Sequence, residues 1–329
     1  MDHSNDPTRN LALELVRVTE AAALASGRFM GRGEKEAADQ AAVNAMRIVL
    51  QTVDMDGFIV IGEGEKDNAP MLYNGEHVGN GSGREFDVAV DPIDGTRPLA
   101  FGRSNSLATV AIAPRGSMFN PGPFVYMNKL AVGPEAKGSI NIERSITENL
   151  KAIAKAKHKD VEDLTTIILD RERNNEMISE IRAAGARIRQ IPDGDVAAAL
   201  MTAWPNSGVD VLIGIGGTPE GVLAACALRA MGGEIQGKLY ARDADELKRG
   251  HDAGYDFNKI LTMDDLVSSE DVFFTATGIT DGELLKGVRY FGNGASTDSL
   301  VVRGLTGTVR QINATHRIDK LRHLSAVKY

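Results

Sequence analysis

The sequence predicts an α/β protein in which helices and sheets are stacked in layers. The chain has 329 residues, of which 43 % are apolar, enough to fill a sizeable core. Its first half places two helices before a group of strands, and its second half alternates strands with helices, a pattern that favours parallel strands. The change of pattern near residue 150 predicts two domains, 1–150 and 151–329.

The first half is expected to pack two helices against a mixed or antiparallel sheet. Asp6 and Pro7 favour a helix start, as N-cap and first helical residue. A second helix is expected from about Glu34 to Leu50. On this helix Asp39 shares the spacing of the apolar residues, so we expect it on the apolar face. Short apolar runs between turn residues predict strands at 58–61, 88–90 and 107–113.

The second half is expected to form a βα sheet with parallel strands. Apolar runs predict strands of this sheet at 165–169, 187–191 and 209–213. Two later strands are expected at 272–276 and 299–302, and the half to which they belong stays open. Helices are expected over 174–184 and 196–203 and from Pro219 onward, and the charged segment 243–265 is expected to be helix followed by loop.

Composition excludes several classes of protein. The chain has 37 Lys and Arg against 45 Asp and Glu, a formal charge of −8, so general nucleic-acid binding is not expected. Its single cysteine, Cys226, excludes a disulfide framework, a four-thiolate zinc site and an iron–sulfur cluster, and its apolar neighbours favour a small core residue. The sequence has neither a signal peptide nor an apolar run of about 18 residues, so we expect a cytoplasmic protein without a membrane partner.

Five carboxylates stand out because each follows an apolar strand, opens a helix or lies on an apolar helix face: Asp39, Glu63, Asp91, Asp94 and Glu220. Burial of one unpaired carboxylate costs several kcal/mol, and converging carboxylates raise each other's pKa. Mg²⁺ and Mn²⁺ prefer oxygen ligands and relieve that repulsion. The pattern therefore predicts a site for more than one metal ion.

Taken singly, these acids also have ordinary explanations. Glu63 lies in a Gly-Glu-Gly-Glu run that is typical of a charged loop, and the segment 91–96 contains a turn. Glu220 follows Pro219 in the first turn of a helix, where the helix dipole stabilises any acid by about 0.3–1 kcal/mol.

The run Asp91-Pro92-Ile93-Asp94-Gly95-Thr96 resembles the Asp-Pro-Ile/Leu-Asp/Glu-Gly-Thr signature of the lithium-sensitive, metal-dependent sugar and inositol phosphatases. Within that superfamily the chain is most similar to the class II fructose-1,6-bisphosphatases. The resemblance covers nearly the whole chain and is carried, in order, by the runs at 61–65, 69–73, 91–96, 126–130, 191–195, 214–222 and 276–280. It implies a layered α-β-α-β-α sandwich with a mixed N-terminal sheet and a mostly parallel second sheet.

The resemblance also implies roles at the reacting end of the substrate. The five carboxylates match metal-site positions of the family. Thr96 matches the threonine that, with a metal and a carboxylate, orients or deprotonates the attacking water. Asp39 and Glu65 are the candidates for that carboxylate. Because a hydroxyl is a weak base, we interpret Thr96 as part of a proton relay and not as a covalent nucleophile.

At the other end, Tyr126, Arg171 and Arg173 match positions that hold the non-reacting phosphate, and arginine suits that task because its planar fork binds phosphate oxygens in pairs. The family commonly has Lys where this chain has Arg171. Further substrate-binding positions are Asp193 and Asp195, which accept hydrogen bonds from sugar hydroxyls, together with Gly95 and Gly194. The same segments are also compatible with a solvated charge run at 170–173 and with a turn and N-cap at 192–195.

A glycine-rich turn at 214–217 invites a comparison with dinucleotide-binding loops. Pro219 replaces the third glycine of that fingerprint. Sugar-phosphate binding is therefore favoured over nucleotide binding.

The implied function is hydrolysis of the 1-phosphate of fructose 1,6-bisphosphate to fructose 6-phosphate and phosphate, with Mg²⁺ or Mn²⁺, in gluconeogenesis. Homo-oligomers, dimers or tetramers, are usual for the family. Alternatives are a sedoheptulose 1,7-bisphosphatase and an inositol-phosphate phosphatase. Asp94 favours the latter, since class II enzymes frequently have Glu there. A non-catalytic ligand-binding protein is the alternative from a different class, and the intact metal and threonine positions count against it.

Overall fold

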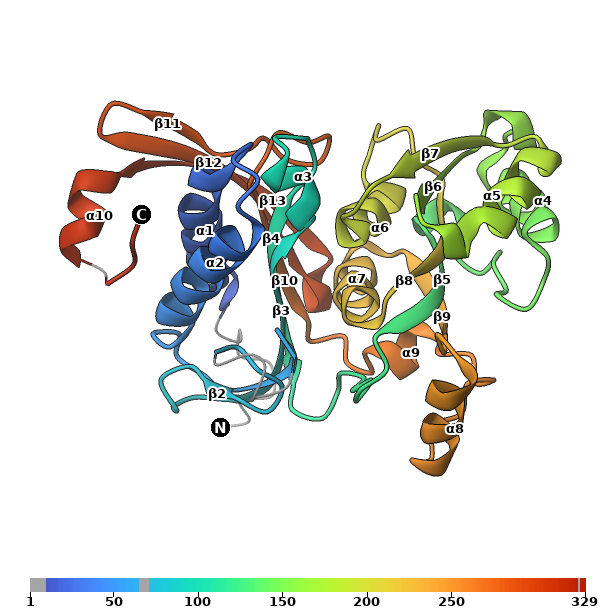
Figure 1. Cartoon of the computed structure of the whole chain (residues 1–329), viewed down its shortest axis with the longest axis horizontal. Coiled ribbons are helices and arrows are strands. Elements are labelled where there is room, and N and C mark those ends of the chain that lie inside the picture. The colour runs from blue at the N-terminus through green and yellow to red at the C-terminus, as the bar shows by residue number, and fades with distance from the viewer. Residues whose placement is uncertain (1–9, 65–70, 325) are drawn as a thin grey trace, which may run out of the picture.

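Helices and sheets alternate in five layers through the molecule (Figure 1). A computed structural model of the chain describes residues 10–64, 71–324 and 326–329. The layered α/β architecture predicted from the sequence is thereby confirmed.

The larger sheet is mixed, as expected. Its order is β11-β12-β10-β4-β3-β1-β2, with β13 paired to β12. β1 and β3 are parallel, and the other pairs are antiparallel. Its strands are β1 (Asp56–Ile61), β2 (His77–Val78), β3 (Glu85–Asp94), β4 (Leu107–Pro114), β10 (Phe273–Gly278), β11 (Arg289–Phe291), β12 (Gly294–Arg303) and β13 (Thr308–Arg317).

The second sheet is mixed, because β5 runs against the other four strands, which share one direction. Its order is β7-β6-β8-β5-β9. β6 is parallel to both β7 and β8, as the βα alternation predicts, whereas β5 is antiparallel to β8 and β9. β5 has the opposite direction because it enters the sheet directly from β4 of the larger sheet, without a crossover helix. These strands are β5 (Tyr126–Val132), β6 (Thr165–Leu169), β7 (Arg187–Ile191), β8 (Val211–Gly217) and β9 (Glu234–Leu239).

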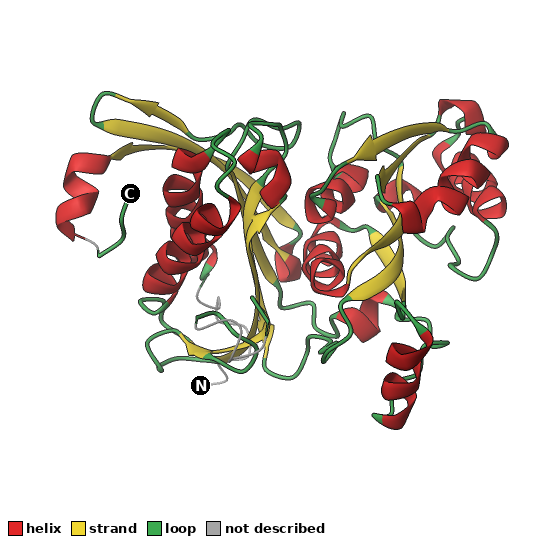
Figure 2. Cartoon of the chain, viewed as in Figure 1, coloured by secondary structure: helices red, strands yellow, loops and turns green. Residues whose placement is uncertain are grey.

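Three helical layers separate and cover the sheets (Figure 2). α1 and α2 cover one face of the larger sheet, α6 and α7 lie between the two sheets, and α4 and α5 cover the far face of the second sheet. The helices are α1 (Ala12–Ser26), α2 (Lys35–Leu50), α3 (Thr96–Ala100), α4 (Ile146–Lys157), α5 (Asn175–Ala184), α6 (Asp195–Ala203), α7 (Thr218–Met231), α8 (Ala244–Asp252), α9 (Met263–Leu266) and α10 (Ile318–Leu324).

Each helical layer has its own buried apolar cluster, and β3 shows how neighbouring clusters meet. Val88 and Val90 belong to the cluster under α1 and α2. Ala89 belongs to the central cluster around α6 and α7. Side chains alternate between the faces of a strand, so a sheet covered on both faces needs a continuous apolar run. The carboxylates at the end of β3 are thereby held at the boundary between two cores.

Most of the expected elements are present close to their expected bounds. α2, β1, β4, β6, β7 and α5 begin and end within two residues of the expected positions. β5 and β9 were not expected as strands. The expected helix start at Asp6 and Pro7 lies outside the described residues.

The chain passes from the larger sheet to the second between β4 and β5, and it returns between β9 and β10. The division at about residue 150 stays a prediction.

No helix within the described residues is long and apolar enough to cross a membrane. Cys226 is fully buried in α7, and burial raises the pKa of its thiol to about 12, so it is a core residue as expected.

The Asn174 side chain forms hydrogen bonds with the backbone at the ends of β6 and β8, close to the predicted phosphate-binding arginines. Its fully buried side chain donates to Leu169 O (3.0 Å) and Ile215 O (3.3 Å) and accepts from Ile215 N (2.8 Å). We predict that Asn174→Ala lowers the free energy of unfolding by about 1–3 kcal/mol, because buried backbone groups lose their partners. Urea unfolding measures this change. Asn175→Ala, at the exposed neighbour, is the control, and an equal effect of both substitutions would contradict the prediction.

Candidate active site

Two parallel strands of the larger sheet end side by side and present acids at the same edge. β1 leads into Glu63, and β3 carries Asp91 and Asp94 at its end. Gly62 is needed at this edge, because a Cβ there would lie 2.0 Å from Leu72 O. Glu63 N donates to the same carbonyl oxygen (2.9 Å). The close approach fixes the direction in which Glu63 leaves the strand.

The segment from Asp91 to Thr96 is the irregular end of β3 followed by a tight turn at Gly95, and hydrogen bonds orient it. Ile93 N donates to Asp91 Oδ1 (3.0 Å), and Ser106 Oγ donates to Gly95 O (2.7 Å). Gly95 has φ +91°, a left-handed conformation that favours glycine, and α3 begins directly after it. The turn expected from the sequence is therefore present, and it also turns Thr96 toward α2.

Thr96 and Asp39 meet across the gap between α3 and α2. The Thr96 hydroxyl donates to Asp39 Oδ1 (3.3 Å) and to Ile93 O (3.3 Å). Asp39 is half-buried beside the buried Ala38 and Ala42, which agrees with its expected place at the apolar face of α2. The two residues form a hydroxyl–carboxylate pair at the edge of the acid cluster.

Asp94 and Glu220 join this cluster from the central layer. Asp94 is 3 % exposed and accepts a hydrogen bond from Ala197 N (3.0 Å) in the first turn of α6. Glu220 lies in the first turn of α7 and folds back over Gly217, where a Cβ would lie 1.7 Å from Glu220 Oε2. Position 217 therefore accepts only glycine while Glu220 keeps this conformation.

Burial and mutual repulsion raise the pKa of every acid in this cluster. Burial raises the pKa of Glu63 to about 7, with further repulsion from Asp39 and Glu220, although part of the Glu63 side chain reaches solvent. Burial and then Asp195 raise the pKa of Glu220 to about 7. The pKa of Asp91 is raised well above its usual range by burial and then by Asp94. The carboxylates of the cluster therefore repel one another, and a bound cation would remove that repulsion.

The donor set fits hard divalent cations, because it consists of carboxylate oxygens placed to repel one another. Within the described residues, no three His, Cys, Asp or Glu side chains are already arranged to hold a metal ion. The structure therefore brings together the five predicted metal-site acids as electrostatic neighbours, and their role as ligands stays a prediction.

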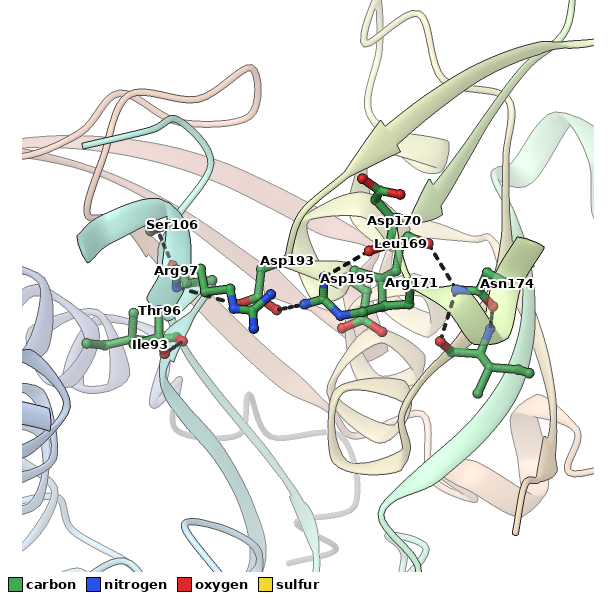
Figure 3. A network of polar contacts seen from close by, with 12 residues as sticks. Ile93, Thr96, Arg97, Ser106, Leu169, Asp170, Arg171, Asn174, Asp193 and Asp195 are labelled. Atoms are coloured by element: carbon green, nitrogen blue, oxygen red, sulfur yellow. Dashed lines mark hydrogen bonds and ion pairs between the residues drawn. The ribbon is translucent and has the colours of Figure 1, made fainter. Parts of the chain in front are cut away.

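A cavity of about 340 Å³ is lined by Glu220 of the acid cluster and by the predicted phosphate-binding residues Tyr126, Arg171 and Arg173. Asp193 and Asp195 belong to the same wall. Asp193 accepts a weak hydrogen bond from Arg97 N (3.5 Å) and faces Arg171 Nη2 at 3.6 Å (Figure 3). Asp193 thereby links the turn of the larger sheet to the arginine loop of the second.

Arg173 is held in place without a carboxylate partner. Its Nε donates to Ile215 O (3.0 Å), and its guanidinium lies 4.4 Å from the centre of the Tyr126 ring. No carboxylate within the described residues forms an ion pair with it. Its remaining N–H groups and its charge are thus available to an anion in the cavity.

Sequence reasoning missed one residue of this site, Lys129. Its Nζ donates to Asp195 Oδ2 and, at 2.8 Å, to Gly217 O. The indication in the sequence was a lone cation directly before the apolar run 130–132, in a segment not recognised as a strand. Gly95 and Gly194 lie at the starts of α3 and α6 with left-handed φ. Glu65 lies outside the described residues.

The chain matches a known protein family and several named proteins. Residues 9–316 match the family described as "Bacterial fructose-1,6-bisphosphatase, glpX-encoded". The chain is 47 % identical over 325 residues to "Fructose-1,6-bisphosphatase 1 class 2" of Escherichia coli strain K12, covering 95 % of this chain and 96 % of the relative. Proteins named "Fructose-1,6-bisphosphatase class 2" from Escherichia coli O6:H1 and Shigella flexneri match with the same identity and coverage.

The raised pKa values predict an unusual pH dependence of stability. Glu63 and Glu220 have folded-state pKa values of about 7, above the ordinary value, so the unfolded chain loses these protons first as the pH rises. We predict that the free energy of unfolding of chelator-treated protein falls between about pH 5 and pH 8. Saturating Mn²⁺ should oppose this fall, because deprotonated carboxylates bind the cation in the folded state only.

Thermal unfolding with EDTA or Mn²⁺ at several pH values measures this effect. Glu20→Gln is the matched control, since burial also raises the pKa of Glu20 to about 7, and its side chain bonds Thr297, outside the acid cluster. This variant should change the pH slope and keep the Mn²⁺ response. A Mn²⁺ response that is absent at pH 8 would contradict the prediction.

Proposed function

Since the chain belongs to the family of bacterial class 2 fructose-1,6-bisphosphatases, we propose that it hydrolyses the 1-phosphate of fructose 1,6-bisphosphate to fructose 6-phosphate and phosphate. As a member of this family it is a phosphoric monoester hydrolase. The observation that carries the proposal is the cavity of about 340 Å³, whose wall holds Glu220 of the acid cluster together with Arg171 and Arg173. A sugar with a phosphate at each end matches both sets of residues.

The acid cluster is the proposed reacting end. The family is metal-dependent, and we propose that Mg²⁺ or Mn²⁺ is held by Asp39, Glu63, Asp91, Asp94 and Glu220. Divalent cations bound there would neutralise the phosphoryl oxygens, acidify a water molecule and stabilise the leaving alkoxide. The carboxylates contribute the negative charge that attracts such ions. Ile93 N keeps the Asp91 carboxylate in a fixed orientation, and Ala197 N does the same for Asp94.

Thr96 and Asp39 are the proposed proton relay. The attacking water gives a proton to Thr96 Oγ while the hydroxyl passes its own proton to Asp39 Oδ1, which it already contacts at 3.3 Å. The net change is one proton moved from water to Asp39, and a hydroxide-like oxygen is left to attack phosphorus.

The arginine end is the proposed anchor of the non-reacting phosphate. Arg173 and Arg171 bind its oxygens, and Tyr126 keeps the Arg173 guanidinium in place by stacking. Asp193 and Asp195, on either side of Gly194, accept hydrogen bonds from sugar hydroxyls, and Gly95 lines the approach to Thr96. This end fixes the distance between the sugar and the reacting phosphate.

Further properties follow from the same proposal. We propose that the chain belongs to the lithium-sensitive phosphatase superfamily, acts in gluconeogenesis in the cytoplasm, and forms a dimer or tetramer. The division into a metal-binding domain (1–150) and a sugar-phosphate-binding domain (151–329) is part of the proposal as well.

Phosphate release from fructose 1,6-bisphosphate, sedoheptulose 1,7-bisphosphate and inositol 1-phosphate tests the activity. With Mn²⁺ or Mg²⁺ we expect the highest kcat/KM for fructose 1,6-bisphosphate, and none of the three should be hydrolysed in EDTA. Equal or faster hydrolysis of inositol phosphate would overturn the proposal in favour of the alternative that Asp94 suggests. A protein that binds these sugars and hydrolyses none would support a non-catalytic role.

The relay is tested by Thr96→Ala. We predict that kcat falls by about 100- to 10,000-fold, the range expected when a positioned proton-transfer group is lost. The dissociation constant of fructose 6-phosphate should change little. Thr96→Ser keeps the hydroxyl and should retain much of the activity, and full activity of the alanine variant would remove Thr96 from the mechanism.

A further inference from the structure

Lys129 is a buried cation in the wall of the proposed substrate cavity. It is 2 % exposed, and among the described residues Arg303 is the only other Lys or Arg that is fully buried. Arg303 pairs with Asp271, whereas Lys129 pairs with Asp195 and also donates to Gly217 O (2.8 Å). Both of these partners line the cavity of about 340 Å³. Lys129 therefore lies behind the cavity wall and contacts two of the residues that form it.

Glycines leave the space that this cation occupies. A Cβ at Gly216 would lie 2.0 Å from Asp195 Oδ2 and 2.9 Å from Lys129 Nζ. A Cβ at Gly221 would lie 3.3 Å from Lys129 Cδ. The glycine-rich turn after β8 is thus explained without a nucleotide, because its open backbone makes room for the ion pair.

The ion pair joins three separate pieces of the site. Lys129 belongs to β5, Asp195 is the first residue of α6, and Gly217 ends β8 directly before α7. The first turns of α6 and α7 carry Ala197, which orients Asp94, and Glu220. One side chain thereby fixes the relative positions of the elements that hold the acids and the sugar.

The charge of Lys129 also matters to the acid cluster. Asp195 repels both Asp94 and Glu220, and Lys129 opposes that effect at Glu220. A carboxylate already paired with a buried ammonium group is a poor ligand for a second cation. Asp195 is therefore set apart from its neighbours and left to accept a hydrogen bond from a neutral hydroxyl.

From this geometry we propose that Lys129 is a positioning residue, which holds Asp195 and the Gly217 carbonyl as a fixed wall for the sugar and keeps Asp195 out of the metal-binding set. The inference rests on the proposed function and adds to it a residue that touches neither the metal ions nor the reacting phosphate. A purely structural ion pair is the competing explanation, and it predicts changes in stability alone.

The test compares Lys129→Met and Lys129→Gln with the wild-type protein. Calorimetric titration with fructose 6-phosphate and, separately, with Mn²⁺ measures binding without turnover. For Lys129→Met we expect the dissociation constant of fructose 6-phosphate and the KM to rise by about 10- to 100-fold, a smaller change in kcat, and Mn²⁺ affinity that is equal or tighter because Asp195 is freed. Lys129→Gln keeps a hydrogen-bond donor, so its constants should lie between those of the wild-type protein and those of Lys129→Met. It also provides a folded variant if methionine prevents folding.

Lys238→Met is the matched control, since Lys238 lies on the adjacent strand β9 and forms a surface ion pair with Glu143 (3.5 Å). It should leave all three constants unchanged. Two outcomes would overturn the positioning role alone. In the first, folded Lys129→Gln and Lys129→Met keep the wild-type KM and affinity for fructose 6-phosphate. In the second, the affinity for Mn²⁺ falls together with the affinity for the sugar phosphate. Wild-type protein that neither binds fructose 6-phosphate nor hydrolyses its bisphosphate would overturn the proposed function and this inference together.

Discussion

Repulsion among carboxylates in one small volume is the constraint on which the rest of the structure depends. Asp91 and Asp94 are separated by two residues at the end of a buried strand, and Glu63 and Glu220 raise the charge density further. Each buried charge would cost several kcal/mol if nothing compensated for it. A fold that tolerates this arrangement must either keep some of the acids protonated or supply positive charge, and the raised pKa values of Asp91 and Asp94 favour protonation when no cation is bound.

The layers of the fold make this concentration of acids possible. The cluster lies where the end of β3 meets the first turns of α6 and α7, so backbone N–H groups and helix dipoles point at the carboxylates. Asp94 uses such a donor, Ala197 N, in place of water. Lys129, the one buried lysine in the part of the chain that the structure describes, donates to Asp195. The five acids that we propose as metal ligands form no ion pair with a Lys or Arg among the described residues.

The sequence predicts this site better than it predicts the sheet that surrounds half of it. Asp91 is identifiable because it ends an apolar strand, and Asp39 because it shares the spacing of an apolar helix face, whereas Glu220 taken singly is an ordinary acid of a first helical turn. Elements such as β5 are not identifiable, because Tyr126–Val132 takes its partners β8 and β9 from about 80 to 110 residues away, and antiparallel pairing over that distance leaves no local pattern. Lys129 was missed for the same reason. Its role depends on Asp195 and Gly217, which only the folded chain brings to it.

The distribution of charge along the cavity reconciles an acidic protein with an anionic substrate. A formal charge of −8 describes the whole molecule, but a phosphate in the cavity meets Arg173, which no described carboxylate neutralises, and Arg171, whose contact with Asp193 is long at 3.6 Å. Under the proposed assignment of the site, the acids repel a phosphate until cations bind to them, and a bisphosphate is first attracted by its non-reacting phosphate to the arginines. The proposed site would accept the second phosphate only after divalent ions have reversed the local sign, which would couple substrate orientation to metal binding.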